Sequence, residues 1–475
     1  MAAVTAMVLS GCVALPADRG AGATTRLVEA RSTVAASVPR LTAPPALTAE
    51  LATRLLSAPV GATEAVQLAL LGSPRMRELY ATLGVSQSEV YDATRLANPS
   101  VGLMRLTPDA GGGHKTTWSI AQSFTELLFL GHRNRVGRAM AVRAEQQVAH
   151  DVLQLEAEVR EAFYAHAGAQ LSMRMRVAAA RGAQASADLA ARFHEAGNIS
   201  LLQRSREEAA ASEAVIGVRR LESQALAARG RLLTLLGIDP ADARVRFTSE
   251  LALPPLLAVD EKDLQALAMT QRLDLTALRT ETDMRRQQLT HATRWRWFGS
   301  LGLSAERERE VEGDLLTGAG GALELPVFNT GKGKVLRANA QAESSAARLA
   351  GLENAIRNDI AVQVAALASA RDTVEEYRTR LLPLKERIVE SSQREQNFML
   401  IGAFELLAAR REELDTYERY VDAVRDYWVQ RARLASAVGG KLPGDDGPGE
   451  SVVLPELAPR PALDAAGQDN RGGVQ

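Results

Sequence analysis

The segment from Gly131 to Ala196 contains no proline and few glycines, and it consists mostly of Ala, Arg, Glu, Gln and Leu. Because these residues are the strongest helix formers, it predicts one helix of about 66 residues, roughly 100 Å long at about 1.5 Å per residue. Its apolar positions, such as Val152 and Leu155, form a narrow alanine-rich stripe typical of closely packed parallel or antiparallel helices. A second such stretch runs from about Val335 to Glu395, interrupted by Pro383. No compact soluble domain accommodates two helices this long.

The second half of the chain resembles the first. We predict an internal duplication, with residues 61–245 as the first repeat and 258–440 as the second, each built of a helix, a β-hairpin, a long helix and a further helix. A Phe-x-x-x-Gly motif recurs at Phe193–Leu202 and Phe398–Leu407, at an offset about six residues larger than that of the earlier blocks. We therefore expect an insertion in one long helix. The earlier blocks pair Leu68-Ala69, Leu79, Phe129 and Arg133 with Leu267-Ala268, Leu278, Phe328 and Lys332.

Between the first two helices of each repeat, the apolar residues change from the helical period to strict alternation. This predicts two hairpins, at residues 99–126 and 295–328, each with two strands of about ten residues. Tilted strands of that length cross a bilayer. One face of the strands is apolar, and the other carries Gly, Ser and Arg, which indicates a water-filled lumen on that side.

Three of the four tryptophans, Trp118, Trp295 and Trp297, fall in these predicted strands. Tryptophan at strand ends is typical of a membrane–water interface, where the ring lies among apolar groups and the N–H meets water. We therefore expect these three to be membrane-interface aromatics. The alternative is that they are core aromatics of a small β-sandwich.

Four strands cannot close into a barrel, and an open sheet edge in lipid leaves backbone polar groups unsatisfied. Three copies of the chain would supply twelve strands, an even number that encloses a wide lumen. The sequence thus predicts a mainly α protein with a membrane β-barrel: a homotrimeric conduit in which each chain contributes four strands carried on long helices.

The N-terminus is apolar and ends in small residues, like the end of a secretory signal, over residues 1–12. Leu9-Ser10-Gly11-Cys12 resembles the bacterial lipobox, in which the cysteine is lipidated. Cys12 is therefore the expected lipidation site, and the attached lipid would anchor the chain to a membrane of the cell envelope. Val13, in place of an Asp, favours the outer membrane; a chance buried cysteine is the alternative. Prolines spread through residues 13–60 predict an extended tether with one short helix near Ala46–Ser57, and residues 441–475 are expected to be a disordered tail.

Several classes of function are excluded by composition. Fifty-six Lys and Arg against 57 Asp and Glu leave a formal net charge of −1, which argues against a nucleic-acid partner. No run of 18 apolar residues occurs, so no membrane-spanning α-helix is expected. One Cys and six scattered His give no disulfide framework and no Cys-based metal cage. No catalytic set or phosphate-binding loop is present, so we expect no enzyme activity, no cofactor and no metal site.

Several junction segments of the chain are informative together: Arg272-x-Asp274-Leu275, Leu325-Pro326-Val327-Phe328-Asn329-x-Gly331, the two Phe-x-x-x-Gly turns, Leu236-Gly237 and Gly439-Gly440. In their order and spacing, the chain resembles the TolC family of outer-membrane efflux proteins, especially the lipidated branch that serves resistance-nodulation-division pumps. The resemblance covers Val60 to Gly440 and implies a trimeric twelve-stranded barrel continued by a periplasmic barrel of long antiparallel helices. It also implies the function of a passive, gated outer-membrane channel in a tripartite efflux system, with a periplasmic adaptor (membrane fusion) protein and an inner-membrane pump as partners.

The same resemblance implies where the functional residues lie. The turns at Phe193–Leu202 and Phe398–Leu407 would form the periplasmic tip, where the family closes its pore and meets the adaptor. Gly197 and Gly402 are expected to adopt the positive φ of a tight helix reversal, and Ser200 occupies the repeat position of Glu405. The candidates for adaptor contact are Gly197, Ser200, Gly402 and Glu405; those for an acidic pore constriction are Glu395, Glu405 and Asp415, although each could equally be a solvated helix residue.

Two alternative functions stay open. The first keeps the fold and makes the chain the outer-membrane duct of a type I protein secretion system. The second is a periplasmic coiled-coil scaffold without a pore. The sequence does not identify the transported substrate, which could be a metal ion, a drug or a protein.

Overall fold

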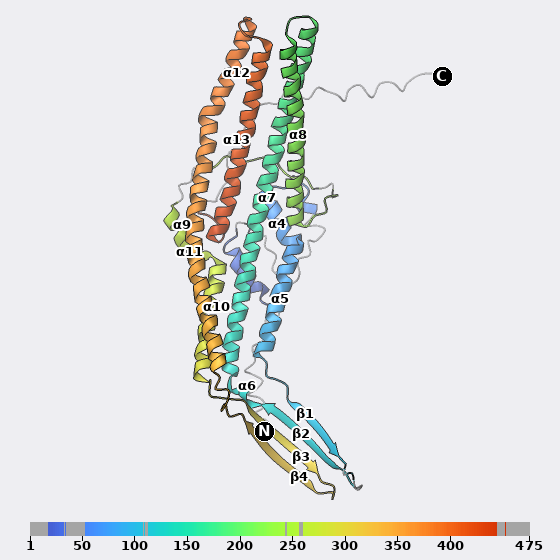
Figure 1. The fold of residues 1–475 in the computed structure, drawn as a ribbon, viewed down its shortest axis with the longest axis vertical. Helices are drawn as coiled ribbons and strands as arrows, with labels where there is room; N and C mark the ends of the chain where they lie inside the picture. The colour runs from blue at the N-terminus through green and yellow to red at the C-terminus, as the bar shows by residue number, and fades with distance from the viewer. Residues whose placement is uncertain are drawn as a thin grey trace, which may run out of the picture.

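The computed structural model describes residues 18–32, 34, 53–107, 109, 113–242, 245–255, 260–443 and 452. These residues form an elongated body of long helices with a small β-sheet at one end (Figure 1). Among the described helices, none combines the length and the apolar character that crossing a bilayer requires. Cys12 and most of the predicted C-terminal tail lie outside the described residues.

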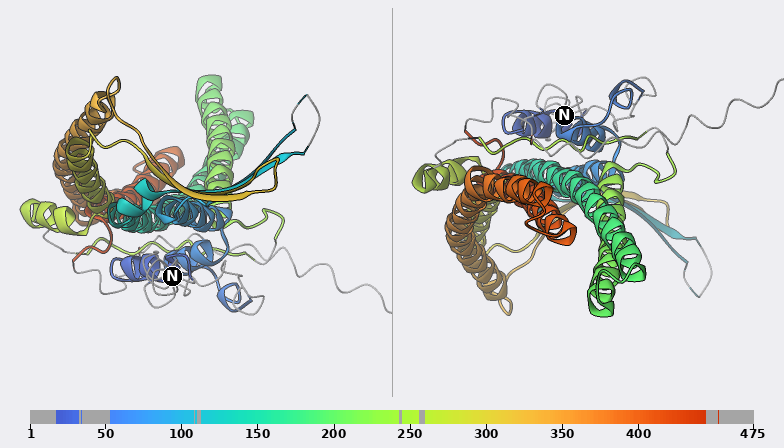
Figure 2. Two further views of the ribbon diagram at one scale, coloured as in Figure 1. Left: turned by 90° about the horizontal axis from the view of Figure 1, so that it is seen from below. Right: turned by 90° about the horizontal axis from the view of Figure 1, so that it is seen from above.

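Helix α7 (Leu130–Glu195) is the central element and has 66 residues, as its proline-free sequence predicts. Its apolar stripe is buried, with Val152, Leu155 and Val159 all at or below 1% exposure. The long helices lie side by side in a curved layer, and α2 and α4 lie on its convex side (Figure 2). The helices that pack on α7 are α2 (Ala21–Glu29), α4 (Ala62–Gly72), α5 (Pro74–Thr94), α8 (Leu201–Leu236), α10 (Leu273–Arg294) and α13 (Ala403–Val438).

The second long helical run is continuous through Pro383. It consists of α11 (Lys332–Glu376), the π-helical turn η2 (Tyr377–Leu381) and α12 (Leu382–Asn397). A proline lacks the N–H of an α-helical hydrogen bond, and its ring clashes with the carbonyl four residues earlier. The wider π-helical turn directly before Pro383 relieves that clash, so the proline marks a bulge in one helix instead of a break between two.

The long helices of the two repeats have equal lengths. Helix α7 has 66 residues, and α11, η2 and α12 have 45, 5 and 16, while α8 and α13 have 36 each. The short α6 (Phe124–Leu128) precedes α7 in the first repeat. The second repeat begins with α9 (Glu261–Gln271) before α10, as the first begins with α4 before α5. The expected insertion of about six residues in one long helix is therefore wrong.

The predicted extended tether contains a helix. Helix α2 (Ala21–Glu29) packs on α7, and Val28 and Thr24 are fully buried. The side chain of Asp18 accepts hydrogen bonds from the backbone N–H groups of Gly20 (3.2 Å) and Gly22 (2.8 Å), which satisfies donors at the start of the helix. The helix forms because no proline occurs between Pro16 and Pro39, so the prolines restrict only the flanks of this segment. Of the short helix expected near Ala46–Ser57, residues 53–55 are helical.

The two hairpins join into one antiparallel sheet. Its strands are β1 (Ser100–Leu106), β2 (Lys115–Ser123), β3 (Leu301–Arg309) and β4 (Leu315–Leu323), in the order β1-β2-β3-β4. The pairing of β2 with β3 therefore links the two repeats. The strands have 7 to 9 residues, close to the predicted length.

Two of the three tryptophans assigned to strands lie outside them. Trp295 is the C-cap of α10, and Trp297 follows it in the connection to β3. The alternating pattern that includes them does not form a strand. The helix-forming residues before Trp295 continue α10 to Arg294, and Trp295 then packs edge-on against Phe129. Only Trp118 lies in a strand.

Candidate functional sites at the two ends of the molecule

The sheet has one apolar face. The strand register places Val101 beside Ile120, Ala305 and Ala319 in one row across all four strands. The next row on this face contains Leu103, Trp118, Arg307 and Thr317. These side chains have little cover: Val101 is 72% exposed, Leu103 61% and Trp118 55%. A continuous exposed apolar surface of this kind marks contact with a membrane or a partner. The sandwich alternative is wrong for the described residues, because the apolar face has no second sheet packed on it.

The opposite face is polar except near the hairpin turns, where it also carries Met104, Leu106 and Leu316. Its rows contain small residues such as Gly102, Ser119 and Gly318. Two of its three charged side chains are paired: Lys115 Nζ lies 2.6 Å from Glu308 Oε1, and Thr117 Oγ1 donates a hydrogen bond to Glu308 Oε2 at 3.3 Å. The third, Glu306, is exposed. The glycines and serines of the predicted polar face do lie together here, whereas the prediction that the same face carries the arginines is wrong, because Arg105, Arg307 and Arg309 lie on the face of Trp118.

The two outer strands of the sheet are unpaired on their outer sides. Within the described part of the chain, β1 pairs only with β2 and β4 only with β3. Each outer edge presents backbone N–H and C=O groups that require partners wherever water is excluded.

A cluster of aromatic rings lies where the helices meet the sheet. Phe129 packs edge-on against His291 (4.8 Å), Trp295 (5.1 Å) and Phe298 (5.9 Å), and His132 stacks on His291 at 3.9 Å. Burial, together with the positive charge of the neighbouring groups, lowers the pKa of His132 to about 4 and also lowers that of His291. Both rings are therefore neutral near pH 7. Sequence reasoning missed this pair because the two histidines come from different repeats and only the tertiary fold brings them together.

At the far end, α7 and α8 are joined by a tight turn. Gly197 has a φ of +76°, as predicted. The N–H of Asn198 donates to the carbonyl of Phe193 at 2.8 Å, which closes the end of α7. Ser200 is the N-cap of α8, and its side chain accepts a hydrogen bond from the N–H of Gln203 at 3.2 Å.

The second turn, between α12 and α13, is built differently from the prediction. Gly402 has a φ of −78° and is the N-cap of α13, while Met399 takes the left-handed conformation at a φ of +59°. The reason is that α12 ends before Phe398, whereas α7 continues two residues past Phe193. The predicted equivalence of Ser200 with Glu405 is therefore wrong: Ser200 corresponds to Gly402.

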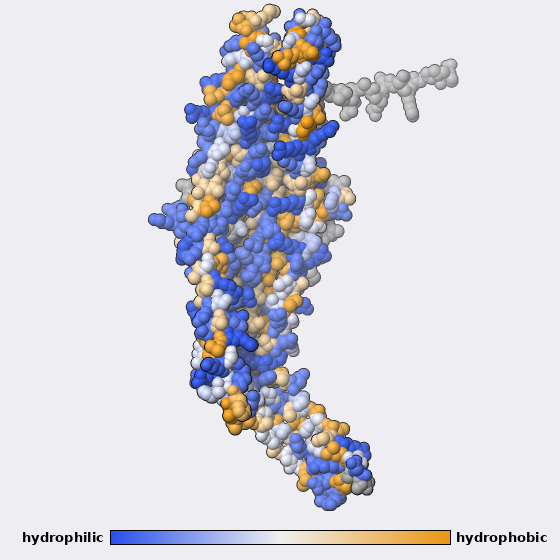
Figure 3. Space-filling view, viewed as in Figure 1, coloured by the Kyte–Doolittle hydropathy of each residue, from blue (hydrophilic) through white to orange (hydrophobic). Residues whose placement is uncertain are grey.

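Both tips expose apolar side chains (Figure 3). Met399 is 91% exposed, and exposed side chains this large and apolar at the end of a helical hairpin indicate a contact surface. We name these residues the tip surface: Leu201, Leu202, Phe398, Met399 and Leu400.

The three acidic candidates lie in different surroundings. Glu395 and Glu405 are exposed beside the second turn, Glu405 in the first turn of α13. Asp415 lies farther along α13 and accepts a hydrogen bond from Arg176 Nη1 of α7 at 3.1 Å, while Arg176 Nη2 lies 2.8 Å from Glu418. Asp415 therefore contributes to the contact between α7 and α13, and only Glu395 and Glu405 belong to the tip.

Glu281 is a buried carboxylate that sequence reasoning did not identify. It lies on α10 and is 5% exposed. Its oxygens lie 3.0 Å from Arg143 of α7 and 2.9 Å from Arg348 of α11. One carboxylate thus holds three helices together near the sheet. No sequence motif marks it, because its partners come from both repeats.

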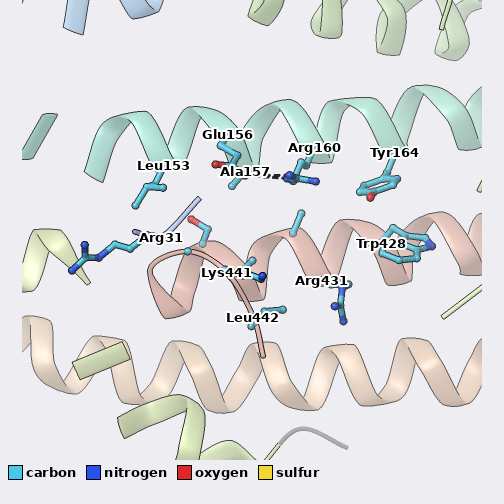
Figure 4. Close-up of a pocket in the computed structure, with 14 residues that line it drawn as sticks. Arg31, Leu153, Glu156, Ala157, Arg160, Tyr164, Trp428, Arg431, Lys441 and Leu442 are labelled. Carbon is cyan, nitrogen blue, oxygen red and sulfur yellow. Dashed lines mark hydrogen bonds and ion pairs between the residues drawn. The ribbon is translucent and has the colours of Figure 1, made fainter. Parts of the chain in front are cut away.

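A pocket between α7 and α13 lies where the N-terminal segment crosses them (Figure 4). Glu156 accepts a hydrogen bond from Ser32 Oγ at 2.6 Å and pairs with Arg160 at 3.2 Å. Tyr164 stacks on Trp428 with ring centroids 5.3 Å apart. Since these side chains make their hydrogen bond, ion pair and ring contact with one another, the pocket marks the place where the N-terminal segment packs on α7 and α13. Among the described residues, no group of three or more His, Cys, Asp or Glu could hold a metal ion.

Comparisons with known proteins support the fold. No protein-family model and no curated protein sequence matches the chain. Solved structures do match: the Campylobacter jejuni outer-membrane channel CmeC has a TM-score of 0.67 at 13% identity, over 80% of this chain and 85% of that one. The outer-membrane channel OprN has a TM-score of 0.67 at 16% identity, over 84% and 95%. CusC, described for transmembrane channel formation, has a TM-score of 0.66 at 14% identity, over 80% and 92%. The chain therefore has the subunit fold of the TolC family of outer-membrane channels.

Proposed function

We propose that the chain is one subunit of a homotrimeric outer-membrane channel that serves as a passive, gated export duct in a tripartite efflux system. The observation that carries this proposal is the four-stranded sheet with one exposed apolar face and two unpaired edges, placed at the end of helices about 100 Å long. Three such sheets would close a twelve-stranded barrel. The likeness of the fold to outer-membrane channels supports the same assignment.

The first test is whether the purified chain forms trimers that conduct ions. We expect trimers by native mass spectrometry in detergent and discrete conductance steps in planar bilayers. Leu103→Asp, which places a charge on the apolar face, should abolish insertion, while Ser119→Asp on the polar face should preserve it. A trimer that never conducts would instead favour the periplasmic scaffold without a pore.

The tip surface is the proposed contact with a periplasmic adaptor, and Gly197, Ser200, Gly402 and Glu405 lie within the same two turns. A photo-reactive amino acid in place of Leu201 or Phe398 should crosslink to a periplasmic protein in living cells. The same group in place of Ile216, an exposed residue of α8 away from the tip, is the control. Equal crosslinking at all three positions would argue against a tip-specific partner.

We further propose that Glu395 and Glu405 form the acidic constriction. Three symmetry-related copies of Glu405 at the tip of the trimer would attract cations, and their side chains would occupy part of the opening. Glu405→Ala should raise the closed-state conductance and weaken cation selectivity. Glu213→Ala, at an exposed position of α8, is the matched control. An unchanged closed state in Glu405→Ala would remove this residue from the gate.

We also propose that Cys12 carries the lipid anchor and that Trp118, Trp295 and Trp297 mark the two membrane interfaces. Trp118 lies toward the hairpin turns of the sheet, and the other two lie where it joins the helices. Labelling cells with radioactive palmitate should mark the parent chain in the outer-membrane fraction and leave Cys12→Ala unlabelled. Equal labelling would exclude Cys12 as the acceptor.

The substrate class can be tested by growth of a deletion strain on metal ions, dyes and hydrophobic antibiotics. Sensitivity confined to metal ions would assign the duct to a heavy-metal pump, and broad sensitivity to a multidrug pump. Loss of a secreted protein with no change on this panel would favour the type I secretion alternative.

A further inference from the structure

The sheet separates its charged side chains by face near the hairpin turns. On the polar face, Lys115 and Glu308 form an ion pair. On the apolar face the strands carry three arginines and no carboxylate, because Arg105, Arg307 and Arg309 all share the face of Trp118. All three arginines lie at the end of the sheet that is farthest from the helices.

Two of these guanidinium groups have no partner among the residues that the structure describes. Within the described residues, Arg307 and Arg309 are exposed and make no side-chain hydrogen bond or ion pair. Arg105, by contrast, lies 2.9 Å from His114 Nδ1 through its Nη2. An unpaired arginine beside an apolar surface is costly in lipid unless an anion neutralises it.

The two free arginines line an open cleft of about 760 Å³ on this face. Trp118 and Thr116 lie on its strand side, and His114, Glu310 and Glu312 line it from the hairpin turns. Below the cleft, toward the helices, the surface is apolar and includes Leu103 and Ile120. The cleft thus combines cations, an aromatic ring and carboxylates directly above an apolar surface.

We propose that this cleft binds a lipid with a phosphorylated sugar headgroup. A guanidinium fork matches the geometry of a phosphate, so Arg307 and Arg309 would hold the phosphate. Sugar hydroxyls donate hydrogen bonds to carboxylates, which gives Glu310 and Glu312 a role that a simple phospholipid headgroup would not use. The acyl chains then lie along the apolar face. This inference rests on the proposed function, since it takes the apolar face as the one in contact with lipid.

The test uses the full chain purified in detergent and native mass spectrometry of its lipid adducts. The probes are bis-phosphorylated lipid A, its dephosphorylated form and phosphatidylglycerol. We expect lipid A to bind most tightly, and the double variant Arg307→Gln/Arg309→Gln to bind it at least about tenfold more weakly. Arg219→Gln/Arg220→Gln, which removes two exposed arginines of α8, is the matched control and should bind as the parent does.

Equal binding of lipid A to the Arg307/Arg309 variant and the parent would overturn the proposal, as would equal binding of the phosphorylated and dephosphorylated forms. Tighter binding of phosphatidylglycerol would replace the sugar lipid with a glycerophospholipid. Conductance of the same preparations in planar bilayers separates this inference from the proposed function. Channels that conduct without selective lipid A binding would leave the function standing and remove only the lipid site.

Discussion

The helical body and the sheet are stabilised in opposite ways. The body buries its apolar residues within a single chain: Leu155, Val159 and Val421 are fully buried among α7 and its neighbours. The sheet holds its strands by backbone hydrogen bonds and leaves Leu103 and Trp118 more than half exposed. The difference teaches that the body can fold in an isolated chain, whereas the sheet gains most of its stabilisation from what surrounds it.

The largest contrast is expected from one substitution made in both regions. Leu155→Ala removes a fully buried side chain and should lower the free energy of unfolding by about 2–5 kcal/mol. Leu103→Ala should change it by less than about 0.5 kcal/mol, because its side chain is exposed. Urea unfolding followed by far-UV circular dichroism measures both. Similar costs would mean that the apolar face of the sheet is covered within one chain.

The ion pairs of Glu281 test how the body is held close to the sheet. Glu281→Ala should cost roughly 1.5–3 kcal/mol, since it removes charge-assisted hydrogen bonds that link α10 to α7 and α11. Asp283→Ala on the same helix removes an exposed pair with Arg286 and should cost less than about 1 kcal/mol. The same denaturant titration compares them. A larger loss in Asp283→Ala would contradict the role of Glu281.

The junction between the two regions should depend on pH. His132 has an ordinary pKa of 6.5 that the folded state lowers to about 4, so the unfolded chain takes up a proton at higher pH than the folded chain. The neutral, partly buried His132 therefore favours the folded state fully above pH 6.5, and this contribution to the free energy of unfolding is lost as the pH falls from 6.5 toward about 4.

In His132→Phe, the melting temperature should fall less steeply over that range, because a phenyl ring keeps the stacking on His291 without titrating. Some dependence persists, since burial also lowers the pKa of His291. Parallel pH profiles for parent and variant would exclude His132 as a source of the effect.

The smallest changes in the free energy of unfolding are expected at the tips. The tips are part of the helical body, but like the sheet they expose apolar side chains. Gly197→Ala should cost about 1 kcal/mol, because alanine is strained at a φ of +76°. Gly402→Ala should cost less, since its φ of −78° suits any residue. Hydrogen exchange of the two turns measures the difference. Equal loss of protection would contradict the distinction between the two turns.

Much of the fold could be predicted from the sequence because it depends on local patterns. The absence of proline and the composition between Gly131 and Ala196 predict α7, and the alternation around Leu103 and Trp118 predicts the strands. The alternation of apolar residues gave a wrong prediction where a contact with a residue distant in the sequence determines the conformation. Trp295 continues the apparent alternation, yet it closes α10 by packing on Phe129.

The candidate sites were less predictable, because motif spacing does not determine where a helix ends. The two Phe-x-x-x-Gly motifs look equivalent, but Gly402 begins a helix and Gly197 follows one. Asp415 was expected near the constriction, and its partner Arg176 could not be found from spacing, since it lies on a helix of the other repeat. Contacts between repeats are set by tertiary packing, which also explains why the Glu281 and His132 clusters were missed.

The pairing of β2 with β3 has a consequence for the order of folding. Each hairpin joins strands that are neighbours in the chain, but the pairing of Ser123 with Gly302 brings together segments separated by the five helices α6 to α10. Contacts between distant segments form slowly, because the intervening chain must first be brought to the right length and direction. The helices supply that geometry, so the sheet is completed after them. We therefore expect the nascent chain to complete the exposed apolar face of the sheet last, after the core around α7 has buried its own apolar residues.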